Sequence, residues 1–208
     1  MWPFGKKDTQ PSQQEGQNPG TSVRVEMLWK AGSRYLGRKQ YEKAYASLQE
    51  AYELQPSRLE GRLNLGAVLY LLGRPEEAVS HLKYVLAFDP QNTVALLNLA
   101  AAYDAVGELD LSVEALEKLV GDRPNWADAN YNLAVAYLKQ DRLEDATLAL
   151  RRELTLNPKH DAARTLLNEV HLKPRRKKAE PTPDGTPPEI ASEGAAEAPK
   201  SELSADNS

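Results

Sequence analysis

Three asparagines recur at an interval of 34 residues, at Asn64, Asn98 and Asn132. A side-chain amide offers both a hydrogen-bond donor and an acceptor, so a row of amides can pair with the backbone of an extended peptide whatever its sequence. The same amides can instead bond to a neighbouring helix, and the sequence leaves both interpretations open. The interval therefore indicates recognition through hydrogen bonds, with Lys30 at the corresponding place in the first unit.

The side chains typical of catalysis are few and scattered. The histidines are His81, His160 and His171, and His81 has Val85, not a second ligand, four residues later. We interpret each histidine as solvated or packed. Phosphate-binding glycine loops and nucleophile motifs are missing, and the chain has no cysteine. The sequence therefore predicts no catalytic residue, no metal site and no cofactor, and so no enzyme.

The segments that carry the asparagines belong to a regular repeat. Four prolines are also spaced by 34 residues, at Pro56, Pro90, Pro124 and Pro158. A period of this length is typical of a solenoid built from two-helix units. Such chains stack their units into an extended binding surface instead of surrounding a catalytic pocket. The period predicts an all-α fold and favours a binding function.

Other columns line up when the chain is written in units of this length. Two columns hold small residues, as needed where the two helices of a unit touch. They are Gly32, Gly66, Ala100 and Ala134, and then Ala44, Ala78, Ser112 and Ala146. Leucine fills a third column and larger residues a fourth. These are Leu48, Leu82, Leu116 and Leu150, and Tyr35, Leu69, Tyr103 and Tyr137. We interpret all four columns as core positions.

The repeats resemble the tetratricopeptide repeat family. The resemblance is clearest in ADANYNLAVAYLKQ, which starts at Ala127, and in NLGAVLYLLGRPEEA, which starts at Asn64. Two positions depart from the family pattern. Lys39 stands where the turn between the helices usually carries glycine, and Glu153 stands in a column that otherwise holds Ala51, Val85 and Leu119. Glu153 weakens the expectation of a tight last helix pair.

The resemblance implies an α-solenoid of four helix-turn-helix repeats followed by a capping helix. The expected repeats are residues 25–58, 59–92, 93–126 and 127–160, and the capping helix spans residues 161–172. The repeat domain is expected at residues 22–173. Residues 1–21 and 174–208 are poor in large apolar residues, and we expect both segments to be disordered.

In this family the first helix of each repeat lines a concave groove. The resemblance therefore implies a peptide-binding groove that contains the three asparagines and a mostly apolar lining. Its expected residues are Trp29, Lys30, Ser33, Leu63, Asn64, Ala67, Tyr70, Leu97, Asn98, Ala101, Tyr131, Asn132 and Val135. Acids follow the lip of this groove, at Glu26, Glu60, Asp104 and Asp128.

Charge and composition exclude other classes of protein. A net charge of −4 argues against nucleic-acid binding by the repeats, because that affinity comes mainly from neutralised phosphates. No apolar run is long enough for a transmembrane segment, so a cytoplasmic location is the default expectation, with peripheral membrane association open. The sequence leaves open whether the aromatic start Met1-Trp2-Pro3-Phe4 and the basic cluster from Arg175 to Lys178 are functional.

The predicted function is therefore that of a non-catalytic protein–protein interaction adaptor or scaffold. Its partner would be another protein, bound through an extended or amphipathic apolar segment in the groove. The alternative is a structural or self-associating subunit that uses the ends of the solenoid or its convex face.

Overall fold

The computed structural model describes residues 19–126 and 128–172, and every regular element there is a helix. The helices are α1 Pro19–Gly37, α2 Tyr41–Leu54, α3 Leu59–Leu71, α4 Pro75–Phe88, α5 Thr93–Val106, α6 Leu109–Asp122, α7 Ala129–Lys139, α8 Leu143–Leu156 and α9 Asp161–Leu172. The predicted all-α fold is confirmed. Residues 19–21, expected in the N-terminal arm, begin α1 instead.

The other residues of the expected arms, including Met1-Trp2-Pro3-Phe4 and Arg175 to Lys178, lie outside the described residues. Among the helices that the structure describes, none combines the length and the apolar composition that a bilayer crossing requires.

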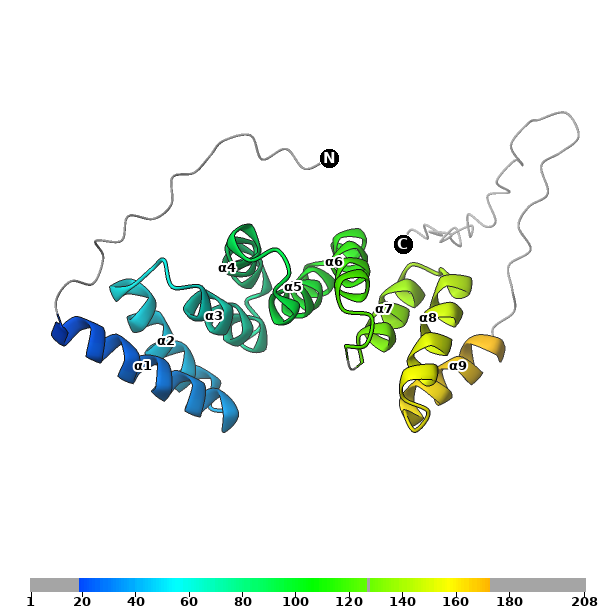
Figure 1. Ribbon diagram of the computed structural model, residues 1–208, viewed down its shortest axis with the longest axis horizontal. Coiled ribbons are helices and arrows are strands. Elements are labelled where there is room, and N and C mark those ends of the chain that lie inside the picture. The colour runs from blue at the N-terminus through cyan, green and yellow to red at the C-terminus, as the bar shows by residue number, and fades with distance from the viewer. Residues whose placement is uncertain (1–18, 127, 173–208) are drawn as a thin grey trace, which may run out of the picture. The chain divides into compact units, whose positions relative to one another are not determined.

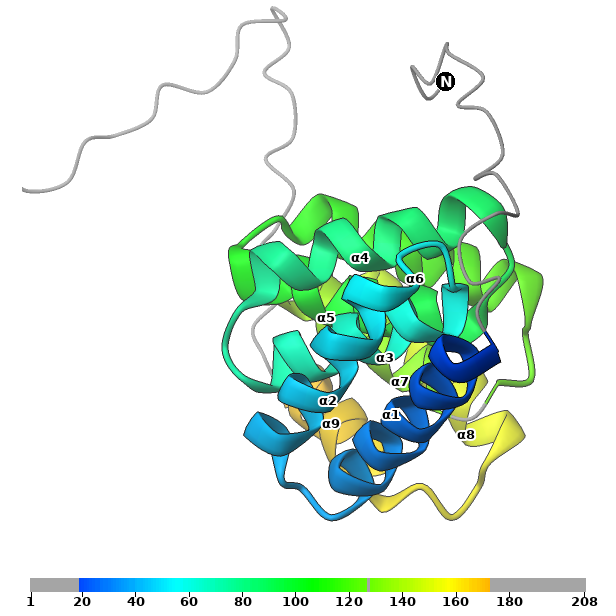
Figure 2. The same cartoon turned by 90° about the vertical axis from the view of Figure 1, so that its left-hand side faces the viewer.

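The helices pack as consecutive pairs. The most extensive contacts are α1 with α2, α3 with α4, α5 with α6 and α7 with α8, and each pair also packs on the next. Figure 1 shows these pairs following one another in chain order, and in Figure 2 α1 and α2 stand in front of the others. The first helices also touch across pairs, since α3 contacts both α1 and α5. We call the surface of α1, α3, α5 and α7 the first-helix face.

Close contact between a small residue and a leucine joins the two helices of a pair. A methyl group added at Gly32 would lie 2.6 Å from Leu48 Cδ2, and one added at Gly66 would lie 2.7 Å from Leu82 Cγ. A side chain at either glycine would therefore require the facing leucine, or the helix that carries it, to shift. These contacts agree with the predicted core columns.

Buried apolar side chains continue along the whole row of pairs. One cluster is built from α1 to α5 and a second from α5 to α9, so α5 contributes to both. Ala163 and Val170 of α9 are buried in the second cluster. The helix α9 thus covers the last pair and shields the apolar face of that pair from water, as a terminal capping element must.

Each pair turns at a residue with positive φ. These residues are Lys39 (58°), Gly73 (73°), Gly107 (85°) and Asp141 (57°). In each turn the next amide donates to a carbonyl five residues earlier, as Gln40 N does to Tyr35 O at 2.9 Å. This hydrogen bond and the left-handed residue are typical of a Schellman helix end. Lys39 therefore adopts the conformation that glycine adopts in the second and third pairs.

Lys39→Gly should raise the free energy of unfolding by about 0.5–1 kcal/mol, because glycine adopts positive φ without the steric cost of a Cβ atom. Urea unfolding of the two proteins measures the difference. The control Lys83→Gly, on the exposed side of α4, should lower stability by about 1 kcal/mol, since glycine inside a helix is unfavourable. Equal losses in both variants would mean that the left-handed turn does not limit stability at Lys39.

Candidate functional site

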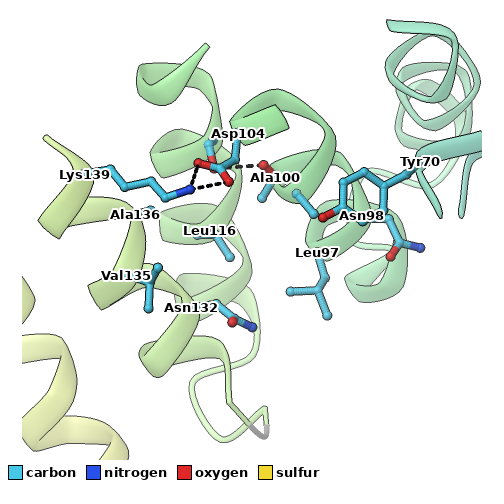
Figure 3. A pocket seen from close by; sticks show the side chains of 12 residues that line it. Tyr70, Leu97, Asn98, Ala100, Asp104, Leu116, Asn132, Val135, Ala136 and Lys139 are labelled. Carbon is cyan, nitrogen blue, oxygen red and sulfur yellow. Dashed lines mark hydrogen bonds and ion pairs between the residues drawn. The ribbon is translucent and has the colours of Figure 1, made fainter. Parts of the chain in front are cut away.

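A pocket of about 300 Å³ opens on the first-helix face between α5 and α7. Its lining comes from four helices, with Tyr70 from α3 and the rest from α5, α6 and α7. The lining residues are Tyr70, Leu97, Asn98, Ala100, Ala101, Asp104, Ser112, Leu116, Asn132, Val135, Ala136 and Lys139. Figure 3 shows Asn98 and Asn132 on neighbouring helices at this pocket.

The pocket has an apolar floor and a polar rim. Leu116 and Ser112 are buried, and the Ser112 hydroxyl donates to the Ala100 carbonyl at 2.9 Å, which satisfies it. At the rim, Lys139 Nζ of α7 lies 2.5 Å from Asp104 Oδ1 of α5 (Figure 3). The pocket can therefore bury an apolar group while hydrogen-bonding groups surround its entrance.

Some of the expected groove residues lie together in this pocket. They are Tyr70, Leu97, Asn98, Ala101, Asn132 and Val135. Others lie elsewhere on the first helices: Lys30 and Ser33 are exposed on α1, and Leu63, Asn64 and Ala67 are half-buried on α3. Tyr131 packs against His160, with the ring centroids 4.9 Å apart. The pocket is thus one part of the expected groove.

Trp29 does not line the groove as expected. Its side chain is 5% exposed and packs over Gly61 of α3, where an added methyl group would lie 2.0 Å from Trp29 Cη2. The physical reason is space, because Gly61 has no side chain and leaves room for the indole. Gly61 is also the signal by which the sequence could have indicated a buried Trp29.

The three asparagines keep their amides available. Asn64, Asn98 and Asn132 are all half-buried at successive first helices. Within residues 19–126 and 128–172, none of these three amides forms a hydrogen bond, so the alternative of a bond to a neighbouring helix is not observed there. Each amide retains a donor and an acceptor for another molecule.

The acids expected at the lip are paired. Glu26 Oε2 and Glu60 Oε2 lie 3.0 Å and 3.5 Å from Arg58, and the hydrogen bond from Arg58 is the main reason that the pKa of Glu26 is lowered. Asp104 pairs with Lys139, and Asp128 lies 3.1 Å from His160. Three of the four lip acids, Glu26, Glu60 and Asp104, therefore have a cationic partner.

Several pocket residues were not among the expected groove residues. Ala100, Ser112, Leu116 and Ala136 are buried between the helices, and the pocket reaches down to them. Lys139 pairs with Asp104, which lies 35 residues earlier and hence in the neighbouring repeat. An acid and a base at this spacing on first helices were the signal that could have revealed the pair.

Models of one protein family match most of the described residues. Three models, each described as tetratricopeptide repeat, match residues 30–93, 69–127 and 127–160. Comparison with curated proteins gives no match.

Several solved structures share the fold. The crystal structure of the MamA protein has a TM-score of 0.66 and 19% identity, and covers 72% of this chain and 82% of that one. MamA 41-end from Desulfovibrio magneticus RS-1 has a TM-score of 0.62 and 23% identity, covering 66% and 77%. YrrB, described as a TPR protein with an unusual peptide-binding site, has a TM-score of 0.65 and 23% identity, covering 71% and 76%. At such identities the likeness is evidence for the fold alone.

His81 lies apart from the pocket and is packed. The His81 ring packs edge to face on Tyr52, with the ring centroids 5.1 Å apart. The guanidinium of Arg62 lies over the same Tyr52 ring, 5.0 Å from its centroid. Burial lowers the pKa of His81, and the charge of Arg62 lowers it further, while Glu77 opposes the shift. The folded protein therefore favours the neutral ring, which fits a packed histidine.

This histidine should make the fold less stable in mild acid. The unfolded chain protonates His81 near its ordinary pKa of about 6.5, and the folded chain only at lower pH, so the free energy of unfolding falls as the pH decreases through 6.5. Urea unfolding between pH 7.5 and 5 measures the loss, which should shrink in His81→Gln. The matched control is His171→Gln, at an exposed site. If both variants keep the whole loss, His81 is not its source.

Proposed function

Because the chain belongs to the tetratricopeptide repeat family, we propose that it is a non-catalytic adaptor or scaffold that binds a segment of another protein on its first-helix face. The family and the fold support a protein-interaction role. One observation carries the proposal further. Asn64, Asn98 and Asn132 hold unpartnered amides at equivalent places on three consecutive first helices. Such a row suits the repeating backbone groups of a bound peptide.

The apolar lining of the pocket is the reason for proposing an apolar segment. Leu97, Leu116 and Val135 supply apolar lining, and Asn98 and Asn132 lie at the same pocket. A bound segment can therefore bury one apolar side chain between α5 and α7 while its backbone meets the amides. The description of YrrB as having an unusual peptide-binding site shows that a chain of this fold can bind a peptide.

Two backbone forms of the segment suit this surface. An extended segment would bring every second side chain to the face, whereas an amphipathic helix would bring side chains at i, i+3, i+4 and i+7. Alanine scanning of a bound peptide separates the two forms by the spacing of its sensitive positions.

A structural or self-associating subunit is the second candidate. The terminal helices expose large apolar side chains, with Val23 and Met27 of α1 at 61% and 66% and Leu172 of α9 at 84%. Contacts between the ends of two solenoids would cover these side chains. Sedimentation equilibrium without added ligand tests this candidate, since self-association raises the mean mass with protein concentration.

The asparagine row should account for a large share of peptide affinity. Peptides selected from a displayed random library with the wild-type protein serve as probes. Combining Asn64→Ala, Asn98→Ala and Asn132→Ala should weaken the binding of a selected peptide at least about 10-fold, which corresponds to about 1.4 kcal/mol. Losing a contact at a partly buried amide leaves the partner group of the peptide unpaired. Calorimetric titration measures the affinities.

A matched control changes three exposed residues of the second helices, by combining Lys83→Ala, Glu114→Ala and Arg151→Ala. Circular dichroism first establishes that both triple variants are folded. Unchanged affinity in the asparagine variant, or an equal loss in the control, would contradict binding at the first-helix face.

A further inference from the structure

The last helix pair buries a carboxylate where the earlier pairs bury apolar groups. Glu153 of α8 is only 2% exposed, and the corresponding positions of the other pairs hold the buried residues Ala51, Val85 and Leu119. Within the described residues, Glu153 Oε2 has no hydrogen-bond partner. A buried carboxylate without a partner is costly unless a proton or a cation compensates it.

A second polar residue is buried in the same repeat. Asn130 of α7 is 2% exposed and occupies the position that Leu96 holds in the preceding repeat. Its Oδ1 atom also has no partner among the described residues. The same two positions of the third repeat, Leu96 and Leu119, belong to one buried cluster. The fourth repeat has therefore exchanged an apolar pair for two oxygen-bearing side chains.

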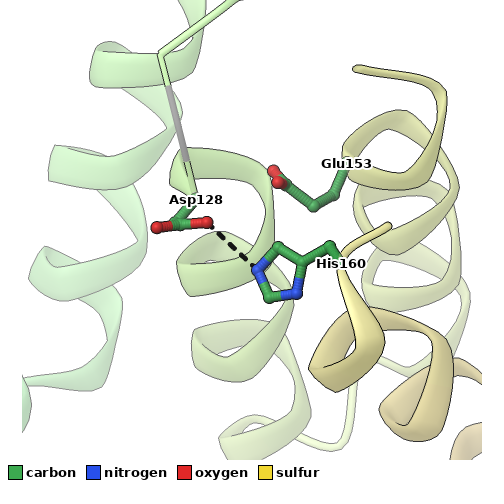
Figure 4. Close-up of side chains that lie close together, drawn as sticks. All are labelled: Asp128, Glu153 and His160. Atoms are coloured by element: carbon green, nitrogen blue, oxygen red, sulfur yellow. Dashed lines mark ion pairs between the residues drawn. The ribbon is translucent and has the colours of Figure 1, made fainter. Parts of the chain in front are cut away.

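Two more ligand-forming side chains meet Glu153. Asp128, Glu153 and His160 each offer one atom, and the three atoms lie within 4.8 Å of one another. His160 Nε2 and Asp128 Oδ1 are 3.1 Å apart. Figure 4 shows that the side chains converge from three places: the start of α7, the helix α8 and the link between α8 and α9.

The surrounding contacts orient Asp128 and His160. Asp128 precedes α7 at the N-cap position, but its carboxylate makes no capping hydrogen bond and faces His160 instead. The His160 ring packs on Tyr131, and His160 Nδ1 accepts from the Ala163 amide at 3.2 Å. These contacts leave Nε2 as the atom that faces the two carboxylates.

We propose that Asp128, Glu153 and His160 bind a divalent metal ion, with Zn²⁺ as the best match to two carboxylates and an imidazole. The ion compensates the buried charge of Glu153 and gives its unpartnered oxygen a ligand bond. Zinc–ligand distances of about 2.1 Å place neighbouring ligand atoms about 3.4 Å apart. The pair His160 and Asp128 already has such a separation. Because all three ligand atoms lie within 4.8 Å of one another, Glu153 needs to approach by no more than about 1.4 Å.

Metal binding is coupled to the start of α9. An ion bound at Nε2 would engage a residue that already contacts α9, because His160 Nδ1 accepts from the Ala163 amide. The other ligands would come from α8, through Glu153, and from the start of α7, through Asp128. The site thus fastens the capping helix to the last pair, although the sequence analysis predicted no metal site.

Thermal unfolding of the full chain, freed of metal by chelation, tests the proposal. ZnCl₂ at 100 times its dissociation constant should raise the Tm by about 5–11 °C. MgCl₂ should leave the Tm unchanged, because Mg²⁺ disfavours imidazole ligands. Calorimetric titration supplies the zinc affinity.

Two variants remove a ligand without removing the local structure. His160→Asn keeps a residue that can cap α9, and Glu153→Leu restores the residue found at Leu119. Each variant should lower the zinc affinity at least about 10-fold. The controls His171→Asn and Glu144→Gln, at exposed sites of α9 and α8, should keep the wild-type affinity. No zinc effect on the wild type, or wild-type affinity in both ligand variants, would overturn the proposal.

Discussion

The contact between a glycine or alanine of one helix and a leucine of its partner is the interaction on which the rest of the structure depends. Gly32 against Leu48 and Gly66 against Leu82 leave no room for a side chain, so the two helices of a pair are held close together. Pairs of equal shape then stack through their remaining apolar faces, which brings the first helices side by side. This stacking places Asn64, Asn98 and Asn132 at equivalent positions of successive first helices.

The sequence predicts those features that repeat, because a column of equivalent residues has the same environment in every unit. The helix pairs and their small and leucine contact positions follow from such columns, whereas α9 follows from the helical spacing of its apolar residues after Pro158. Trp29 was misplaced because its burial depends on Gly61 in the next unit, which a column within one unit does not contain. The Asp104–Lys139 pair was missed for the same reason, since the two residues come from neighbouring units. Contacts that differ from one pair to the next therefore require the structure.

Departures from the repeat have two different meanings in this chain. Lys39 departs from glycine but keeps the backbone conformation of the turn, so the fold absorbs it at a small cost. Glu153 departs from an apolar column and remains buried, with an oxygen that finds no partner among the described residues. A polar residue that the core tolerates only at a cost, beside Asp128 and His160, indicates a local function. The fourth repeat thus contains buried polar residues, Asn130 and Glu153, that the pattern shared by the repeats does not explain.

The central claim is that the first-helix face binds the backbone of a partner segment through its asparagine amides. Nuclear magnetic resonance of the side-chain amides, during titration with a peptide selected by the wild-type protein, tests it most directly. The account predicts that the signals of Asn64, Asn98 and Asn132 shift, while those of the exposed Asn157 and Asn168 stay in place. Shifts confined to residues of the second helices or of α9 would contradict the claim.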